Sequence, residues 1–200
     1  MGYEDKIYDL EDMNKRLAKY IDQNRWYHTQ GVRYMSVALA MAHGVNLMQA
    51  ECAGLLHDCA KCISDQKKIK ICDKNGIPIT DVERENPFLL HAKVGAYIAK
   101  EKYGVTDPAI LDAITYHTTG RPGMTPLEQI VFIADYIEPR RNKSQHLPEI
   151  RRAAFRNLDE CCYEILKDML LYLNSKKGDI DSNTQEAFTF YEEVHEDRRD

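Results

Sequence analysis

The chain has 200 residues, of which 44% are hydrophobic, enough for one large domain or two small ones. Its 27 Lys and Arg against 32 Asp and Glu give a net charge of −5, which argues against a nucleic-acid partner, since that class favours basic stripes. No apolar run approaches the roughly 20 residues that span a membrane, and the polar, acidic start is untypical of a signal peptide. We therefore expect a cytoplasmic protein with no membrane or nucleic-acid partner.

The hydrophobic residues recur at helical spacing, and no segment alternates with the period of two that is typical of strands. Asn46 and Ser64 are placed as helix N-caps, and Gly44 and Gly104 close two helices. The first half of the chain is thus predicted to form helices over residues 10–21, 27–42, 47–56, 65–75 and 88–103.

The second half continues the helical pattern, with clearer start signals. Asp107-Pro108 opens a helix to about His117, and Thr125-Pro126-Leu127-Glu128 is a capping box that opens a helix ending before Pro139. Pro148 begins a long pattern to about residue 173, and a weaker helix follows over 184–194. We expect one all-α domain over residues 1–178, with a polar C-terminal helix or tail over 179–200.

His57-Asp58 is the most informative pair of the sequence, because it ends the apolar run Ala53-Gly54-Leu55-Leu56. Adjacent helical residues differ in direction by about 100°, so both side chains can face one site only near a helix end. Two neighbouring metal-binding side chains at the end of a buried segment are hard to explain by packing. The pair therefore predicts a site at the end of this helix.

Four more potential ligands lie beside or within apolar helical stretches: His28, His91, His117 and Asp135. Asp135 interrupts an apolar run, and an isolated buried carboxylate is costly unless it is paired or bound to a metal. Taken singly, each of these residues is as well explained by a structural role. Taken together with His57-Asp58, they favour a metal site. In an all-α fold, the ligands of this site would lie between helices.

Six nitrogen and oxygen ligands are too many for one tetrahedral metal and suit two ions that share a carboxylate. Without a thiolate, such a set accepts iron, manganese, cobalt or zinc. Lys61 follows the pair closely, Arg121 lies in the loop after His117, and Arg140 and Arg141 follow the helix of Asp135. These cations suit a multiply charged polyphosphate substrate.

The six cysteines include one suggestive pair, Cys59-x-x-Cys62. A structural zinc site would need a second pair at matching spacing, and a thioredoxin-like redox site would need a βαβ setting. Neither is present in the sequence pattern. We therefore expect reduced thiols that fill small spaces in the core.

Together these residues resemble an HD-domain metal-dependent phosphohydrolase, whose H…HD…D pattern is matched by His28, His57-Asp58 and Asp135. His91 and His117 match the two extra histidines of the dinuclear branch. More closely, the chain resembles the YqeK family of symmetrical bis(5′-nucleosyl)-tetraphosphatases, which split diadenosine tetraphosphate into two ADP. The resemblance rests on the strings HTQGVRYMSVALA, AGLLHDCAK, HAKVGA and AITYHTTGRPGMTPLEQIVFIADYIEPRR.

The resemblance implies a di-iron or related dinuclear centre that hydrolyses a dinucleoside polyphosphate with metal-activated water. By position, one metal would be held by His28, His57, Asp58 and Asp135, and the second by His91 and His117 with Asp58 as the bridge. Asp58 and Lys61 would be catalytic, with Lys61 neutralising charge on the phosphoryl oxygens. The substrate-binding residues would be Lys61, Thr118, Gly120, Arg121 and Arg140.

Three alternatives remain open from the residues. Another HD phosphohydrolase would act on a mononucleotide or an alarmone, and a mixed-valence iron pair would activate oxygen instead of water. A non-catalytic nucleotide-binding module would bind without hydrolysis. The sequence also leaves open the native metal, the base preference and whether the protein forms a homodimer.

Overall fold

The computed structural model describes residues 7–142, 144–176 and 179–198. Every regular element within these ranges is helical, so the all-α prediction is confirmed. None of the described helices has the length and apolar character needed to cross a membrane. Residues 1–6 of the polar N-terminus, and Gly178 at the expected domain boundary, lie outside the described residues.

The elements of the first half of the chain follow the predicted order. They are α1 (Leu10–Leu17), α2 (Gln23–His43), α3 (Leu47–Leu56), α4 (Asp65–Asn75), α5 (Asp81–Glu85), the 3-10 turn η1 (Pro87–Leu90) and α6 (His91–Tyr103). Asn46 caps α3 as expected, because its side chain accepts a hydrogen bond from the Gln49 backbone N–H at 3.1 Å.

The boundary between α1 and α2 differs from the prediction, because Asp22 is an N-cap. Its backbone is extended and its side chain accepts from the Arg25 N–H at 2.9 Å. Helix α2 therefore begins at Gln23 instead of Tyr27, and α1 ends at Leu17 instead of Ile21. The consequence for the site is that Arg25 and His28 lie on the first turns of one helix.

Two elements before α6 also differ from the prediction. Helix α5 was missed, although Thr80 and Glu83 form a capping box at its start. The helix expected from Phe88 begins as the 3-10 turn η1, and α-helical geometry starts only at His91. The turn matters because its Phe88 carbonyl accepts a hydrogen bond from His91.

The second half contains α7 (Pro108–Tyr116), α8 (Pro126–Ile137), α9 (Leu147–Ala154), α10 (Leu158–Lys176) and α11 (Ser182–Asp197). The capping box of Thr125 and Glu128 is confirmed. The single helix expected from Pro148 to residue 173 is wrong. The chain breaks after Ala154 because the Asn157 side chain accepts from the Glu160 N–H at 3.2 Å and starts a new helix.

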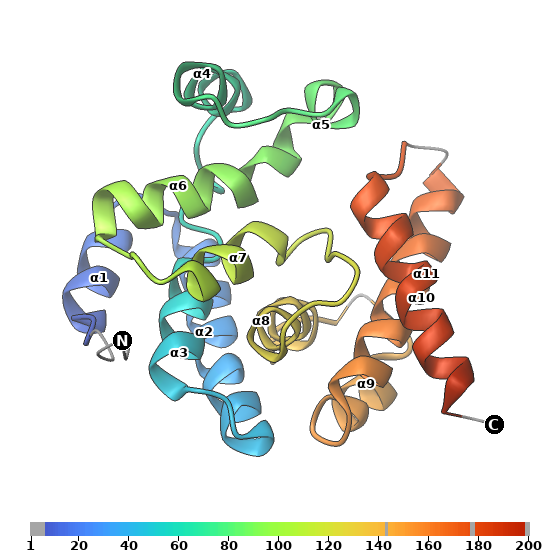
Figure 1. Cartoon of the computed structure of the whole chain (residues 1–200). Helices are drawn as coiled ribbons and strands as arrows, with labels where there is room; N and C mark the ends of the chain where they lie inside the picture. The colour runs from blue at the N-terminus through green and yellow to red at the C-terminus, as the bar shows by residue number, and fades with distance from the viewer. Residues whose placement is uncertain (1–6, 143, 177–178, 199–200) are drawn as a thin grey trace, which may run out of the picture.

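Helix α8 is the central element, seen end-on in the middle of Figure 1. It is apolar on nearly all sides, as expected for a helix surrounded by others, and packs against α2, α3 and α7 as well as α9 and α10. Helices α2 and α3 approach closely at Gly54, where an added Cβ would lie 2.7 Å from Ser36 Oγ. This close contact fixes the C-terminal end of α3, where His57 and Asp58 follow.

Helix α11 packs along α10 at the right of Figure 1. Its Tyr191 is buried, and the Gln129 side chain of α8 donates to the Tyr191 hydroxyl at 3.1 Å. His195 lies 2.6 Å from Glu160 of α10. These contacts join the C-terminal helix to the rest, and the division into a core over 1–178 and a separate segment over 179–200 stays a proposal.

Candidate metal centre

The six residues predicted as metal ligands come from five helices and lie around one point. His28 is in α2, Asp135 is in α8, and His91 begins α6. His57 and His117 are the residues that end α3 and α7, and Asp58 follows His57 in a turn. The four histidines and Asp58 are buried, while Asp135 is half-buried.

Two groups of ligand atoms within this site each have the spacing of a metal site. His28, His57 and Asp58 form one group, and Asp58, His91 and His117 form the other, with all ligand atoms of a group within 4.8 Å of one another. Asp58 belongs to both groups. Its Oδ2 lies 3.7 Å from His28 Nε2 and its Oδ1 lies 3.3 Å from His91 Nε2, as expected for a bridging carboxylate.

Asp135 adds a second carboxylate to the first group. Its Oδ1 lies 2.9 Å from His28 Nε2 and 3.9 Å from His57 Nε2. The same oxygen accepts from Arg141 Nη2 at 2.7 Å. The position of Asp135 inside an apolar helix is thus explained by its partners, because the carboxylate lies among two imidazoles and a guanidinium.

Backbone carbonyls orient three of the histidine rings. The Nδ1 atoms of His57, His91 and His117 lie 2.8, 2.6 and 2.7 Å from the carbonyl oxygens of the residues three positions earlier. A carbonyl oxygen only accepts, so each Nδ1 carries the hydrogen and each neutral ring turns the lone pair of Nε2 to the centre. Metal-binding histidines are commonly held in this way.

Several lone pairs face one another at the centre, and one of the acceptor atoms receives no hydrogen bond. His91 Nε2 and His117 Nε2 lie 3.3 Å apart, and Asp58 Oδ1 is buried beside them without a hydrogen-bond partner. Lone pairs of nitrogen and oxygen that face one another in a buried space repel unless a cation lies between them. The donor set therefore fits two metal ions with Asp58 as their common ligand.

The pKa shifts of His91, Asp58 and Asp135 agree with metal binding, which requires neutral imidazoles and ionised carboxylates. Burial, reinforced by the charges of Lys61 and His117, lowers the pKa of His91 to about 3. Burial raises the pKa of Asp58, but His57, His117 and Lys61 outweigh it and hold that pKa well below its ordinary value. Burial also raises the pKa of Asp135, but the hydrogen bond with His28 and the charge of Arg141 outweigh it and hold that pKa well below its ordinary value.

Lys61 and Thr118 lie directly at the second group. Lys61 Nζ donates to His91 Nε2 at 2.9 Å and is 3.7 Å from Asp58 Oδ1. Burial lowers the pKa of Lys61, and the charge of Asp58 partly offsets this decrease. The Thr118 hydroxyl lies 3.1 Å from the Nε2 atoms of both His91 and His117. Both side chains are therefore within reach of a group bound at the second metal position.

Three residues at the site were missed by sequence reasoning or given too little weight. Arg25 Nη1 donates to Asp58 Oδ2 at 2.6 Å. Glu138 is buried, and its Oε1 lies 3.1 Å from His28 Nδ1, so this carboxylate orients His28. Arg141, which we did not choose as a substrate residue, contacts Asp135 through both its side-chain Nη2 and its Nε.

The other predicted substrate residues have different surroundings. Arg121 donates to both oxygens of the buried Glu128 at 2.6 and 2.9 Å, so its guanidinium holds the start of α8. Gly120 is buried with a φ of +68°, a conformation that favours glycine, in the loop after α7. Arg140 is exposed, and its Cζ lies 4.9 Å over the ring of Tyr27. Their substrate-binding roles stay predictions.

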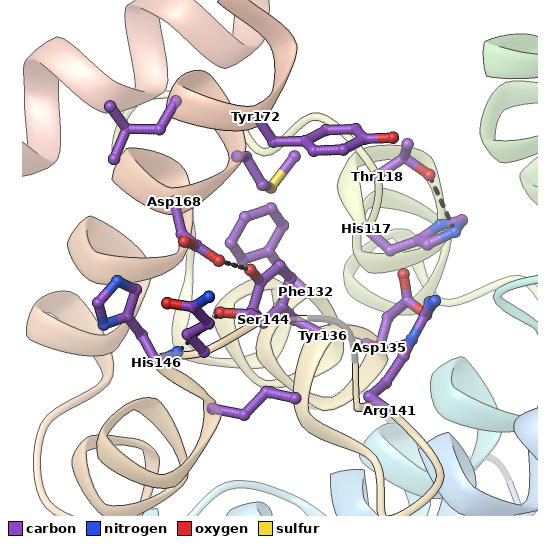
Figure 2. A pocket seen from close by; sticks show the side chains of 14 residues that line it. His117, Thr118, Phe132, Asp135, Tyr136, Arg141, Ser144, His146, Asp168 and Tyr172 are labelled. Atoms are coloured by element: carbon purple, nitrogen blue, oxygen red, sulfur yellow. Dashed lines mark hydrogen bonds and ion pairs between the residues drawn. The ribbon is translucent and has the colours of Figure 1, made fainter. Parts of the chain in front are cut away.

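Two cavities of similar volume open beside the ligands. The first, of about 600 Å³, is lined by residues that include His117 and Asp135 as well as Met169 and Tyr172 of α10. Figure 2 shows His117, Asp135 and Tyr172 around it. The second, of about 620 Å³, is lined by polar and charged residues that include Arg25, His28 and Arg140. Arg141 lines both, so the two cavities meet at the metal centre.

The pair Cys59 and Cys62 flanks the site without joining it. Cys59 is buried and Cys62 is exposed, and both thiols are free. Burial raises the pKa of Cys59 far above its ordinary value, which keeps it a thiol. The expectation of reduced, space-filling cysteines agrees with these surroundings for Cys59.

Comparison with known proteins places these observations in a family context. Residues 25–140, more than half of the chain, match the HD domain model. A symmetrical bis(5′-nucleosyl)-tetraphosphatase of Bacillus subtilis is 37% identical over 84% of this chain and 89% of its own length. The protein of that description from Staphylococcus aureus is 35% identical over 88% of this chain and 92% of its own length. A crystal structure from Clostridium acetobutylicum, described as an HD superfamily hydrolase involved in NAD metabolism, has a TM-score of 0.90 and 34% identity, with 94% of this chain and all of that chain covered.

Proposed function

Because this chain belongs to the HD-domain family and to its YqeK-type branch, we propose that it hydrolyses diadenosine tetraphosphate and related dinucleoside polyphosphates symmetrically, giving two ADP. The enzyme class is a hydrolase that acts on phosphoric anhydrides. The relatives that carry this activity in their description are aligned with it over nearly their whole length.

One observation carries the proposal from the side of the structure. Four imidazole Nε2 atoms and the carboxylates of Asp58 and Asp135 converge in a buried centre, and Asp58 Oδ1 has no hydrogen-bond partner there. This donor set supports a two-metal site over a structural zinc cage, which is closed by thiolates or by four ligands. When bound, a pair of metal ions activates water at neutral pH and stabilises charge on phosphoryl oxygens.

The chain's own residues would then bind and orient the polyphosphate. Lys61 Nζ lies beside Asp58 and His91, and it would donate to a phosphoryl oxygen at the cleaved bond. Arg25 and Arg141 line the polar cavity beside the ligands and would neutralise the neighbouring phosphates. Thr118 would position a phosphate oxygen by its hydroxyl. Asp58 and Lys61 are thus the residues to which we assign the chemistry.

We assign iron to the centre, with manganese, cobalt and zinc as alternatives that the same nitrogen and oxygen donors accept. His28, His57, Asp58 and Asp135 would hold one ion, and His91, His117 and Asp58 the other. We also propose a cytoplasmic location and no nucleic-acid partner, since the net charge of −5 provides no basic stripe. A homodimer stays an open alternative.

The test is a product analysis with diadenosine tetraphosphate as substrate. The protein is loaded with Fe²⁺ or Mn²⁺ under nitrogen, or treated with a chelator, and the nucleotides are separated after incubation. We expect ADP as the sole product. Its formation should require metal and should not require oxygen. The Asp58→Ala variant should be inactive, and Asp73→Asn, which changes an exposed aspartate of α4, should be fully active.

Other products would overturn parts of the proposal. AMP together with ATP would mean that water attacks an outer phosphorus, and turnover that requires oxygen would mean oxygenase chemistry. Binding of diadenosine tetraphosphate without hydrolysis in the metal-loaded protein would mean a nucleotide-binding module. Activity of Asp58→Ala would remove Asp58 from the reaction.

A further inference from the structure

The two cavities at the metal centre differ in chemistry, although a dinucleoside tetraphosphate has two identical ends. The first cavity, which we call the α10 pocket, is walled by Phe132 of α8 and by Met169, Leu171 and Tyr172 of α10. Its volume of about 600 Å³ is within the range of small-molecule sites. Apolar and aromatic walls with a few polar groups are typical of sites for planar organic ligands.

Tyr172 gives the α10 pocket an exposed aromatic ring, with Lys176 Nζ 5.6 Å from the ring centroid. Tyr172 is 62% exposed, and in Figure 2 its ring extends from α10 toward the side of the pocket where Thr118 and His117 lie. Asp168 also lines the pocket. The Tyr136 hydroxyl donates to its Oδ2, and the other oxygen of this carboxylate can accept a hydrogen bond from a ligand amino group. A stacking ring beside a carboxylate acceptor suits an amino-substituted nucleobase.

The second cavity, which we call the arginine cleft, has a different lining. Its described lining residues are all polar or charged and include Arg25, Arg140 and Arg141. Among these described residues none has an aliphatic or phenyl side chain. The cleft therefore matches phosphates, and a second base would meet no apolar wall there.

We propose that the site recognises one nucleoside only, in the α10 pocket, and holds the other half of the substrate in the arginine cleft by its phosphates. This inference rests on the proposed function. Its consequence is a second substrate class, the nucleoside 5′-tetraphosphates, which lack the second nucleoside. Water adds across the bond between the second and third phosphorus atoms counted from the bound nucleoside. The products of adenosine 5′-tetraphosphate are then ADP and diphosphate, as those of diadenosine tetraphosphate are two ADP.

The first experiment measures the binding of two products, ADP and diphosphate, to the metal-loaded protein by calorimetry. Tyr172→Ala should weaken ADP binding by about 10- to 100-fold, the usual contribution of one stacked base, and should leave diphosphate binding unchanged. Tyr34→Ala is a matched control, because Tyr34 is also 62% exposed but lies on α2 away from the pocket. If Tyr172→Ala leaves ADP binding unchanged, or weakens both ligands alike, the pocket does not bind the nucleoside.

The second experiment compares kcat/KM for adenosine 5′-tetraphosphate and diadenosine tetraphosphate. We expect values within about 10-fold of each other, since the distal nucleoside makes no contact worth more than that factor, and we expect Tyr172→Ala to lower both equally. A larger preference for the dinucleotide would overturn the inference while leaving the proposed function intact. If neither compound is cleaved, the proposed function fails, and the binding experiment alone decides the role of the α10 pocket.

Discussion

The Glu138 carboxylate holds the His28 ring through a contact of 3.1 Å between Oε1 and Nδ1, although 110 positions separate them in the sequence. Gly31, one turn after His28, makes the contact possible, because a Cβ at this position would lie 2.6 Å from Glu138 Oε2. A carboxylate behind a histidine fixes the ring orientation and makes its other nitrogen a better metal ligand.

Replacement of Glu138 should therefore weaken metal binding without removing a ligand. We expect Glu138→Ala to lower the affinity for Mn²⁺ by about 10- to 100-fold, with Glu138→Gln in between, since its amide oxygen still accepts from Nδ1. Titration of the chelator-treated protein with Mn²⁺ measures the effect. The control is Glu149→Gln, on the exposed side of α9. Equal affinity of wild type and Glu138→Ala would show that His28 does not need this support.

The buried His91 makes the metal-free protein sensitive to acid. Its pKa in the folded state is about 3, against 6.5 as the ordinary value, so below pH 6.5 the unfolded chain binds a proton that the folded chain does not. Stability is then lost as the pH falls from 6.5 towards 3. Between pH 7.5 and 5 we expect a loss of about 2 kcal/mol in the free energy of unfolding.

Urea unfolding in the presence of a chelator checks this expectation. The His91→Asn variant keeps a donor for the Phe88 carbonyl but has no titrating ring, so its stability should fall by less over this interval. The depressed pKa values of Asp58 and Asp135 act only below their ordinary value of 3.8, outside the tested range. The same loss in variant and wild type would exclude His91 as the cause.

Arg121 is expected to affect stability rather than substrate affinity. Arg121→Ala would leave the buried Glu128 without its bidentate partner, although the Thr125 N–H still donates to it. Since Arg121 is itself one-third exposed, we expect a loss of about 1–3 kcal/mol in the free energy of unfolding. Arg152→Ala, which breaks the exposed pair with Glu149, should change stability by less than about 1 kcal/mol.

The opposite pattern would restore the substrate role that the sequence predicted for Arg121. In that case Arg121→Ala would raise KM for diadenosine tetraphosphate at unchanged unfolding midpoint. Measuring both quantities on the same preparation separates the two roles.

Lys61 should act on the chemical step and not on metal binding. We expect Lys61→Met to lower kcat by about 100- to 1,000-fold, the usual effect of removing one donor that stabilises developing charge, at unchanged metal content. Lys67→Met, in the exposed part of α4, is the control and should retain full activity. If Lys61→Met loses its metals as well, the lysine supports the ligands and its catalytic role is not needed to explain the loss of activity.

The sequence could single out candidate ligands because some of them contradict their local surroundings. His57-Asp58 ends an apolar run and Asp135 interrupts one, and such polar residues need partners. The all-α architecture followed from helical spacing and from start signals such as Thr125 to Glu128. The break between α9 and α10 was missed because the cap at Asn157 lies within a continuous apolar pattern.

The residues that support the ligands could not be predicted in the same way. Arg25 pairs with Asp58 over 33 positions and Glu138 contacts His28 over 110, and neither stands out from its neighbours in an exposed or charged segment. Arg121 shows the converse case. Its place after His117 suggested a substrate contact, whereas its partner Glu128 is the residue that also caps α8.

The central claim, that Asp58 bridges two metal ions, is tested most directly by counting metals. The protein is loaded with Mn²⁺ and freed of excess ions under gentle conditions, and bound metal per chain is determined by elemental analysis for the wild type, Asp58→Ala and the surface variant Asp73→Asn. We predict two ions per chain for the wild type and for Asp73→Asn, and fewer than one for Asp58→Ala. A single ion per wild-type chain, or two ions retained by Asp58→Ala, would contradict the proposed dinuclear centre.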